Sequence, residues 1–294
     1  MSSLCFSGSL VATAPDYCFV DHKHHVHFEG EYRHVGSAEF RTHTDGVKGT
    51  HLHYRDGSAS VYLSHDLTEK NSLSWQLGYS YMKIDWKENP RFKEDEYNYG
   101  LASLAWISTS IDKWRWITNA GVSVNTHEMD FGKTAAGWGL FWGRCAFNDH
   151  MGAHVGVVGY GGMGNGYVLP ILGLDWDNPK WKLKAIFPLD LSAEYLFNDY
   201  FSTALAYAGF GGPYRYPNRA HEGIGRFKEA IFSIYSSGLE LDLKGRYKDW
   251  FKASIGAGWN FGGWLYIKDR HNHHAAYYKY KGAPYAQGNL SFSF

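Results

Sequence analysis

The stretch 251–268 is Phe251-Lys-Ala-Ser-Ile-Gly-Ala-Gly-Trp-Asn-Phe-Gly-Gly-Trp-Leu-Tyr-Ile-Lys268, and its residues alternate between apolar and polar or small. Successive side chains of a β-strand point to opposite faces, so a period of two predicts a strand. The apolar face comprises Phe251, Ala253, Ile255, Ala257, Trp259, Phe261, Gly263, Leu265 and Ile267. A strand of this length is about twice as long as is usual in soluble proteins.

The same alternation recurs from about residue 25 to the end of the chain, which predicts an all-β protein. Polar clusters that favour turns separate the segments. Short ones lie at 68–71, 111–113, 148–150, 177–180, 198–200 and 245–249. Longer connections are expected at 42–50, 88–96, 128–136, 160–166, 188–190, 213–226 and 269–283, although 188–190 is short for this class. Six short and seven long connections predict fourteen strands with both termini at the short-turn side; twelve strands is the alternative.

Composition excludes several classes of protein. The 294 residues carry 29 Lys+Arg and 29 Asp+Glu, so the net charge is zero and no nucleic-acid partner is expected. No run of 18 apolar residues occurs, which excludes a helical membrane protein. The three cysteines form no disulfide scaffold or zinc motif. The content of 12 Trp, 22 Tyr and 18 Phe is far above that of an ordinary soluble domain.

Alternation alone fits either a soluble β-sandwich or a barrel with lipid outside and water inside. The strands are long enough to cross a hydrocarbon layer, which takes about 9–11 residues. Aromatic residues gather near strand ends, as at 79–86, 97–99 and 277–280, which is the position of an aromatic girdle. We therefore predict a closed antiparallel transmembrane barrel. A soluble ligand-binding sandwich or lipocalin-like barrel remains the alternative.

The inferred inner face carries charges of both signs. Because burying these side chains in a dry core would be costly, we expect a wet interior. The predicted lumen-lining residues are Arg115, Lys182, Lys184, Glu194, Glu240, Asp242, Lys244, Lys252 and Lys268.

The chain ends on Ala286-Gln-Gly-Asn-Leu-Ser-Phe-Ser-Phe294, with Leu290, Phe292 and Phe294 on one face. This ending resembles the assembly signal of Gram-negative outer-membrane β-barrels. The resemblance implies a location in the outer membrane, contact with its lipid, and the barrel-assembly machinery as a partner. Leu290, Phe292 and Phe294 are the residues that would carry the signal.

A narrower resemblance lies in Leu169-Pro-Ile-Leu-Gly-Leu-Asp-Trp176, followed by Asn178-Pro-Lys-Trp181, Phe187-Pro188 and Gly209-Phe-Gly-Gly212. This run is similar to a family of uncharacterised outer-membrane barrels known as a domain of unknown function. The similarity implies fold and location but no activity.

The first residues have the apolar, small-residue character of a signal peptide and include Ala12-Thr-Ala14, but they lack a cationic start. We predict a signal or exported N-terminal segment at 1–24 and a barrel domain at 25–294.

Three motifs have simpler explanations than a catalytic or binding site. Gly159-Tyr-Gly-Gly-Met-Gly164 matches GxGxxG, but Pro170 follows in a strand-like run rather than a helix, so a glycine loop or lumen segment is expected instead of a dinucleotide site. The histidines at 22–27 and 271–274 have irregular spacing, and no metal is expected. His127 beside Glu128 and Asp130 is the compact acid–histidine cluster, but it lies in a polar loop. No cofactor and no enzymatic activity are expected.

The predicted function is a passive, porin-like conduit for small polar solutes with weak ion preference. A surface-exposed structural or adhesive barrel without conductance is the first alternative. An outer-membrane enzyme comes next.

Overall fold

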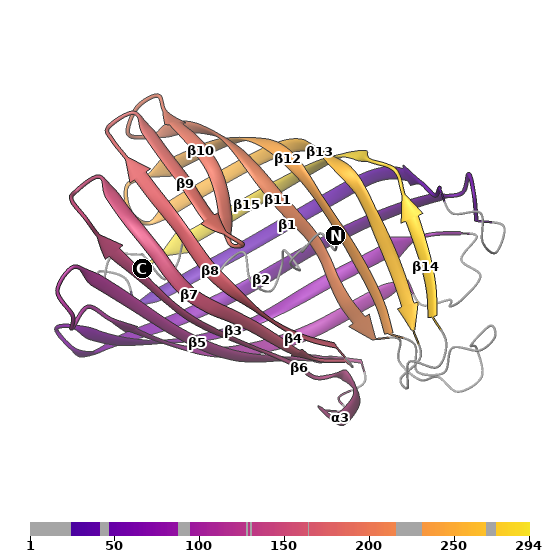
Figure 1. Ribbon diagram of the computed structural model, residues 1–294, viewed down its shortest axis with the longest axis horizontal. Coiled ribbons are helices and arrows are strands. Elements are labelled where there is room, and N and C mark those ends of the chain that lie inside the picture. Colours follow the sequence, from indigo (N-terminus) through magenta and orange to yellow (C-terminus); the bar gives the residue numbers. More distant parts are fainter. Residues whose placement is uncertain are drawn as a thin grey trace.

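The computed structural model describes residues 25–41, 47–87, 95–127, 129, 131–163, 165–215, 231–268 and 275–294. Within these parts nearly every residue lies in a strand (Figure 1). The strands are β1 (Val26–Glu39), β2 (His51–Thr68), β3 (Asn71–Asp85), β4 (Glu96–Ser108), β5 (Trp114–Asn125), β6 (Ala136–Ala146), β7 (Met151–Gly162), β8 (Asn165–Asp177), β9 (Trp181–Phe187), β10 (Asp190–Leu196), β11 (Phe201–Arg215), β12 (Ile231–Tyr247), β13 (Phe251–Lys268), β14 (Ala275–Tyr280) and β15 (Ala283–Ser293). The short helix α3 (Phe131–Thr134) precedes β6. Among the described residues, no helix is long and apolar enough to cross a membrane.

The strands form one closed antiparallel barrel. From β1 to β14, neighbours in sequence pair with one another, and β1 pairs with β15 to close the sheet. β13 pairs with β15 along its first half and with β14 along its second half. β14 and β15 are therefore two pieces of one interrupted strand, and the barrel has the fourteen strands that the connections predict.

The two ends of the barrel differ as the sequence predicts. Six short turns lie at one end, together with the first and last strand ends, where Val26 and Phe294 exchange backbone hydrogen bonds of 3.1 and 2.8 Å. We call this the turn end and the opposite one the loop end. The turn end is the periplasmic side in bacterial barrels, because their long loops face outward.

The glycine-rich segment 159–166 departs from the prediction. β7 continues to Gly162 and β8 begins at Asn165, and Gly161 lies opposite Gly166 in the ladder. The segment is a tight hairpin of the wall, not a long loop or a lumen segment. Gly162 has a φ of +132°, which only glycine adopts without strain, and this allows so short a connection.

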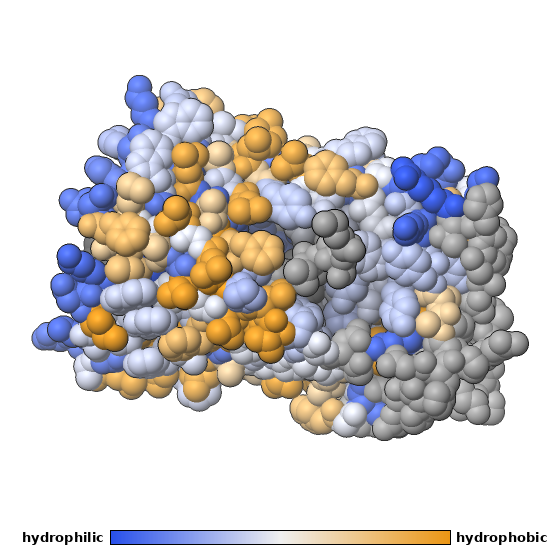
Figure 2. Space-filling model, in the orientation of Figure 1, coloured by the Kyte–Doolittle hydropathy of each residue, from blue (hydrophilic) through white to orange (hydrophobic). Residues whose placement is uncertain are grey.

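The outer surface is apolar toward the turn end (Figure 2). Exposed side chains there include Trp75, Leu77, Leu172, Leu241 and Ile255. Closure pairs every strand with a neighbour on each side along at least part of its length, and an apolar exterior suits lipid, so this architecture spans a membrane. The chain has the fold of an outer-membrane β-barrel.

The alternation in β13 changes phase at one place. Ile255, Trp259 and Phe261 face lipid, with exposed fractions of 67, 54 and 57 %, but Leu265 and Ile267 are fully buried inside the barrel. The ladder to β12 shifts register between Ser236 and Gly238, and Gly262 there has a φ of +87°. This bulge inverts the two faces.

The prediction of one continuous apolar face is therefore wrong beyond Phe261. Lys268 follows Ile267 on the other face of the strand, and its place in the lumen stays a prediction. It is buried, with 3 % exposed.

Candidate functional site

The candidate functional site is the barrel interior, because the polar strand faces line it toward the turn end. Eight of the predicted residues lie on this inner face: Arg115, Lys182, Lys184, Glu194, Glu240, Asp242, Lys244 and Lys252. Their neighbours along the strands face outward; Leu239, Leu241 and Leu243, for example, alternate with the two acids and the lysine of β12 and are exposed to lipid.

A buried polar network joins β12 to β15, β1 and β2. The Gln287 amide donates to Glu240 at 3.0 Å and to Asp242 at 3.4 Å, and Arg33 Nε donates to the Gln287 amide oxygen at 3.4 Å. Arg33 also pairs with Asp56 at 3.5 Å. We call Arg33, Asp56, Glu240, Asp242 and Gln287 the carboxylate network. It holds three carboxylates and one guanidinium, so its charges favour cations.

A second charged group lies at the turn end, where β10, β11 and β12 meet. Lys244 Nζ is 3.4 Å from Glu194, and the Ser202 hydroxyl donates to the same carboxylate at 2.7 Å. Lys182 lies directly opposite Glu194 in the ladder. The predicted residues on these strands are therefore brought together around one carboxylate.

The remaining predicted residues lie apart from these groups. Lys184 pairs with Asp190 at 2.9 Å beside the β9–β10 turn. Arg115 lies opposite Arg144 in the ladder, and Arg144 pairs with Asp175 at 2.8 Å. Lys252 is exposed at the turn end.

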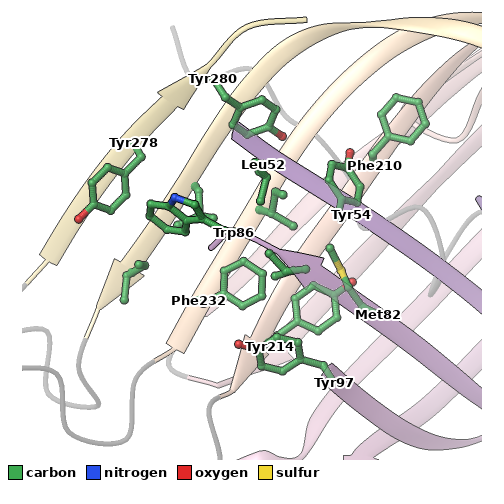
Figure 3. Close-up of a cluster of buried hydrophobic side chains, with 14 of the residues drawn as sticks. Leu52, Tyr54, Met82, Trp86, Tyr97, Phe210, Tyr214, Phe232, Tyr278 and Tyr280 are labelled. Carbon is green, nitrogen blue, oxygen red and sulfur yellow. The ribbon is translucent and has the colours of Figure 1, made fainter. Parts of the chain in front are cut away.

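Toward the loop end the interior is apolar and aromatic instead of wet (Figure 3). The ring of Tyr97 on β4 lies 5.4 Å from that of Tyr214 on β11 and 5.1 Å from that of Phe232 on β12. β4 and β11 are seven strands apart in either direction around the barrel, so these rings meet across its full width. We call Tyr97, Tyr214 and Phe232 the aromatic bridge. It narrows the interior at this level.

Sequence reasoning missed the aromatic bridge and three of the five residues of the carboxylate network, namely Arg33, Asp56 and Gln287. Arg33 and Asp56 each follow an outward-facing residue, Tyr32 and Arg55, along their strands. The alternation of the sequence therefore could have predicted that both side chains point into the barrel. The bridge had no comparable signal, because aromatic residues near strand ends also form the lipid-facing girdle.

The histidine clusters and the acid–histidine cluster of the sequence analysis do not join the charged groups described above. Several of their residues lie outside the part of the chain that the structure describes. His22, His24, 271–274, Glu128 and Asp130 lie outside them. His27 is buried and its Nδ1 lies 2.8 Å from the Ser293 hydroxyl. His127 is exposed and lies 3.4 Å from the Asn98 amide. Among the residues that the structure describes, no group of three or more His, Cys, Asp or Glu could hold a metal ion.

Comparison with known proteins supports the fold. No protein-family model matches the chain, and no curated protein matches it in sequence. An outer membrane channel from Pseudomonas putida F1 is similar over 92 % of this chain and 96 % of its own, with a TM-score of 0.50 and 7 % identity. The KdgM porin, solved with disordered oligogalacturonate, covers 90 % and 99 % with a TM-score of 0.36 and 9 % identity. The Pseudomonas putida toluene transporter TodX covers 100 % and 95 %, with a TM-score of 0.42 and 9 % identity. At 7 % identity, the likeness to the Pseudomonas putida F1 channel shows the barrel fold alone.

Proposed function

We propose that this barrel is a passive conduit for small polar solutes. The observation that carries the proposal is the polar inner face toward the turn end, where charges of both signs line the barrel. Glu194, Lys182 and Lys244 present such charges from three strands. Charged groups are costly to bury unless they are paired, hydrogen-bonded or hydrated, and an inner face with charges of both signs is typical of a barrel with a polar interior.

The lining residues have distinct roles in this proposal. The carboxylate network attracts cations, whereas Lys182, Lys184, Lys244, Lys252 and Arg115 offset it, which gives a weak ion preference. The aromatic bridge limits solute size at the loop end. The conduit needs no catalysis, so the chain is not proposed to be an enzyme.

Two further proposals concern assembly and family. Leu290 and Phe294 face outward on the last strand, with 52 and 63 % of their surfaces exposed, and Phe292 lies between them on the same face. Their side chains are therefore available to the barrel-assembly machinery as a recognition signal. We also propose that residues 169–212 mark a family of uncharacterised outer-membrane barrels, and that 1–24 is an export segment preceding the 25–294 barrel.

Liposome swelling tests the conduit proposal. Purified barrel reconstituted into vesicles should allow entry of glycerol and arabinose at rates that fall with solute size. Closed barrel is identified by its faster migration in unboiled gels. Vesicles that contain closed barrel but swell no faster than empty vesicles would contradict the proposal and favour the structural or adhesive alternative.

A further inference from the structure

The barrel wall is incomplete on one side. β9 and β10 contain seven residues each, whereas their neighbours β8 and β11 contain 13 and 15. β9 pairs with β8 only from Leu172 to Asp177, and β10 pairs with β11 only from Ser202 to Tyr207. Beyond these points no described strand pairs with the facing edges of β8 and β11. In Figure 1 both strands continue toward the loop end past the tip of the β9–β10 hairpin.

This gap lies at the depth of the hydrocarbon layer. A tilted strand needs about 9–11 residues to cross it, so the seven-residue hairpin stops about 2–4 residues short. At about 3.3 Å per residue, the missing wall is roughly 7–13 Å long on each side. The outer face of β8 stays apolar past the hairpin tip, where Val168 is 71 % exposed. The gap therefore faces lipid, not water.

The backbone of both edges is adapted to the missing strand. The Asn178 N–H donates to the Trp181 carbonyl at the β8–β9 turn. Backbone groups of successive residues point to opposite sides of a strand, so the N–H and C=O groups of even-numbered β8 residues point toward β9. The Phe197 N–H donates to the Phe201 carbonyl at the β10–β11 turn. By the same alternation, the N–H and C=O groups of odd-numbered β11 residues point toward β10. Pro170 and Pro213 fall on these two sets, so the N–H that each proline lacks would have pointed into the gap. Within sheets, proline occurs at edges, at the first residue of a strand and at bulges; Pro170 is exposed and Pro213 is buried.

The lumen behind the gap is apolar. From β8, Leu169 and Ile171 face inward, and Ile171 is fully buried against Ile186 of the hairpin. From β11, Ala208 packs against the buried apolar and aromatic side chains at the loop end, which include the fully buried Phe210. A molecule that passed between the two edges would meet apolar side chains on both sides. The aromatic bridge narrows the axial route at the loop end, which leaves this side route next to the polar interior.

We propose that the space between β8 and β11, beyond the β9–β10 hairpin, is a lateral opening through which small molecules with an apolar body pass between the outer leaflet and the lumen. The inference rests on the proposed conduit function and names a second class of solute for the same lumen. Such a molecule would leave the lipid beside Val168 and Pro170 and enter past Leu169 and Ala208. Its polar group, if present, would then reach the charged residues nearer the turn end.

Lengthening the hairpin tests the opening. Insertion of Thr-Val after Phe187 and Thr-Val before Asp190 continues the alternation of both strands and fills the wall. The matched control receives the same four residues between Lys48 and Gly49, in the β1–β2 connection at the loop end. Each variant is expressed in a porin-deficient Gram-negative host, and uptake of the apolar dye 1-N-phenylnaphthylamine is measured. Purified variants are also tested for liposome swelling by arabinose.

We expect the hairpin variant to lose dye uptake to the level of cells without the barrel, while the control variant keeps it and both retain arabinose entry. Unchanged dye uptake in a folded hairpin variant would overturn the lateral opening. Failure of the unaltered barrel to admit arabinose would instead contradict the conduit function, so the two failures are distinguishable.

A second measurement decides the matter if the lengthened hairpin does not fold. Bimane is attached to Leu169→Cys or to Gln76→Cys, with Cys5, Cys18 and Cys145 replaced by serine. Both positions face the lumen, but Gln76 lies on β3 within the intact wall. In bilayers with brominated acyl chains, the Leu169 label should be quenched and the Gln76 label should not. Equal signals at the two positions would overturn the proposal.

Discussion

The substitution Ile255→Arg tests which face of β13 meets lipid. Ile255 is the fifth residue of a strand that enters the membrane near Phe251, so with about 9–11 residues per crossing it lies near the midplane. Its side chain is 67 % exposed on the outer surface. An arginine at this depth on the lipid face should lower the free energy of unfolding by about 2–4 kcal/mol.

Ser254→Arg is the matched control one residue away. Ser254 faces the lumen, where its hydroxyl accepts a hydrogen bond of 3.3 Å from Asn289. The new arginine would lie opposite Lys244, and like charges in this position cost up to about 1 kcal/mol. Urea unfolding in lipid vesicles, followed by tryptophan fluorescence, gives both free energies. Equal costs for the two substitutions would refute the assigned facing.

Three other predictions concern the terminus, the aromatic bridge and the lumen charge. Deletion of Phe294 should reduce barrel levels in cell membranes without slowing refolding in detergent; normal membrane levels would argue against its role as an assembly signal. Combined Tyr97→Ala and Phe232→Ala should raise single-channel conductance, because rings that meet across the barrel are removed, and an unchanged conductance would show that the bridge is not the narrowest point. Combined Glu240→Gln and Asp242→Asn should shift the reversal potential in a salt gradient toward anions, and a shift toward cations would contradict the charge assignment.

Most of the fold could be predicted from the sequence because lipid and water impose a period of two on each strand. The position of the turns followed from polar clusters, and the fourteen strands followed from the turns. The bulge near Gly262 could not be predicted, because glycine fits either face and conceals the change of phase. The lumen position predicted for Lys268 depends on an unbroken alternation through this point.

The site was less predictable than the fold. Glu240 and Asp242 were identified by their alternation with leucines, but the link through Gln287 to Arg33 depends on which strands close the barrel. The aromatic bridge joins β4 to β11 across the interior, and no local pattern encodes a contact of that kind. The unusual shortness of 188–190 was visible in the sequence, but its meaning required the lengths of β8 and β11 on either side.

Planar-bilayer recording of the refolded protein tests the central claim most directly, with the unboiled gel shift used to show that the barrel is closed. The account predicts stable, stepwise conductance with a weak preference for one sign of ion. A closed barrel that inserts into the bilayer but carries no current would contradict the conduit function.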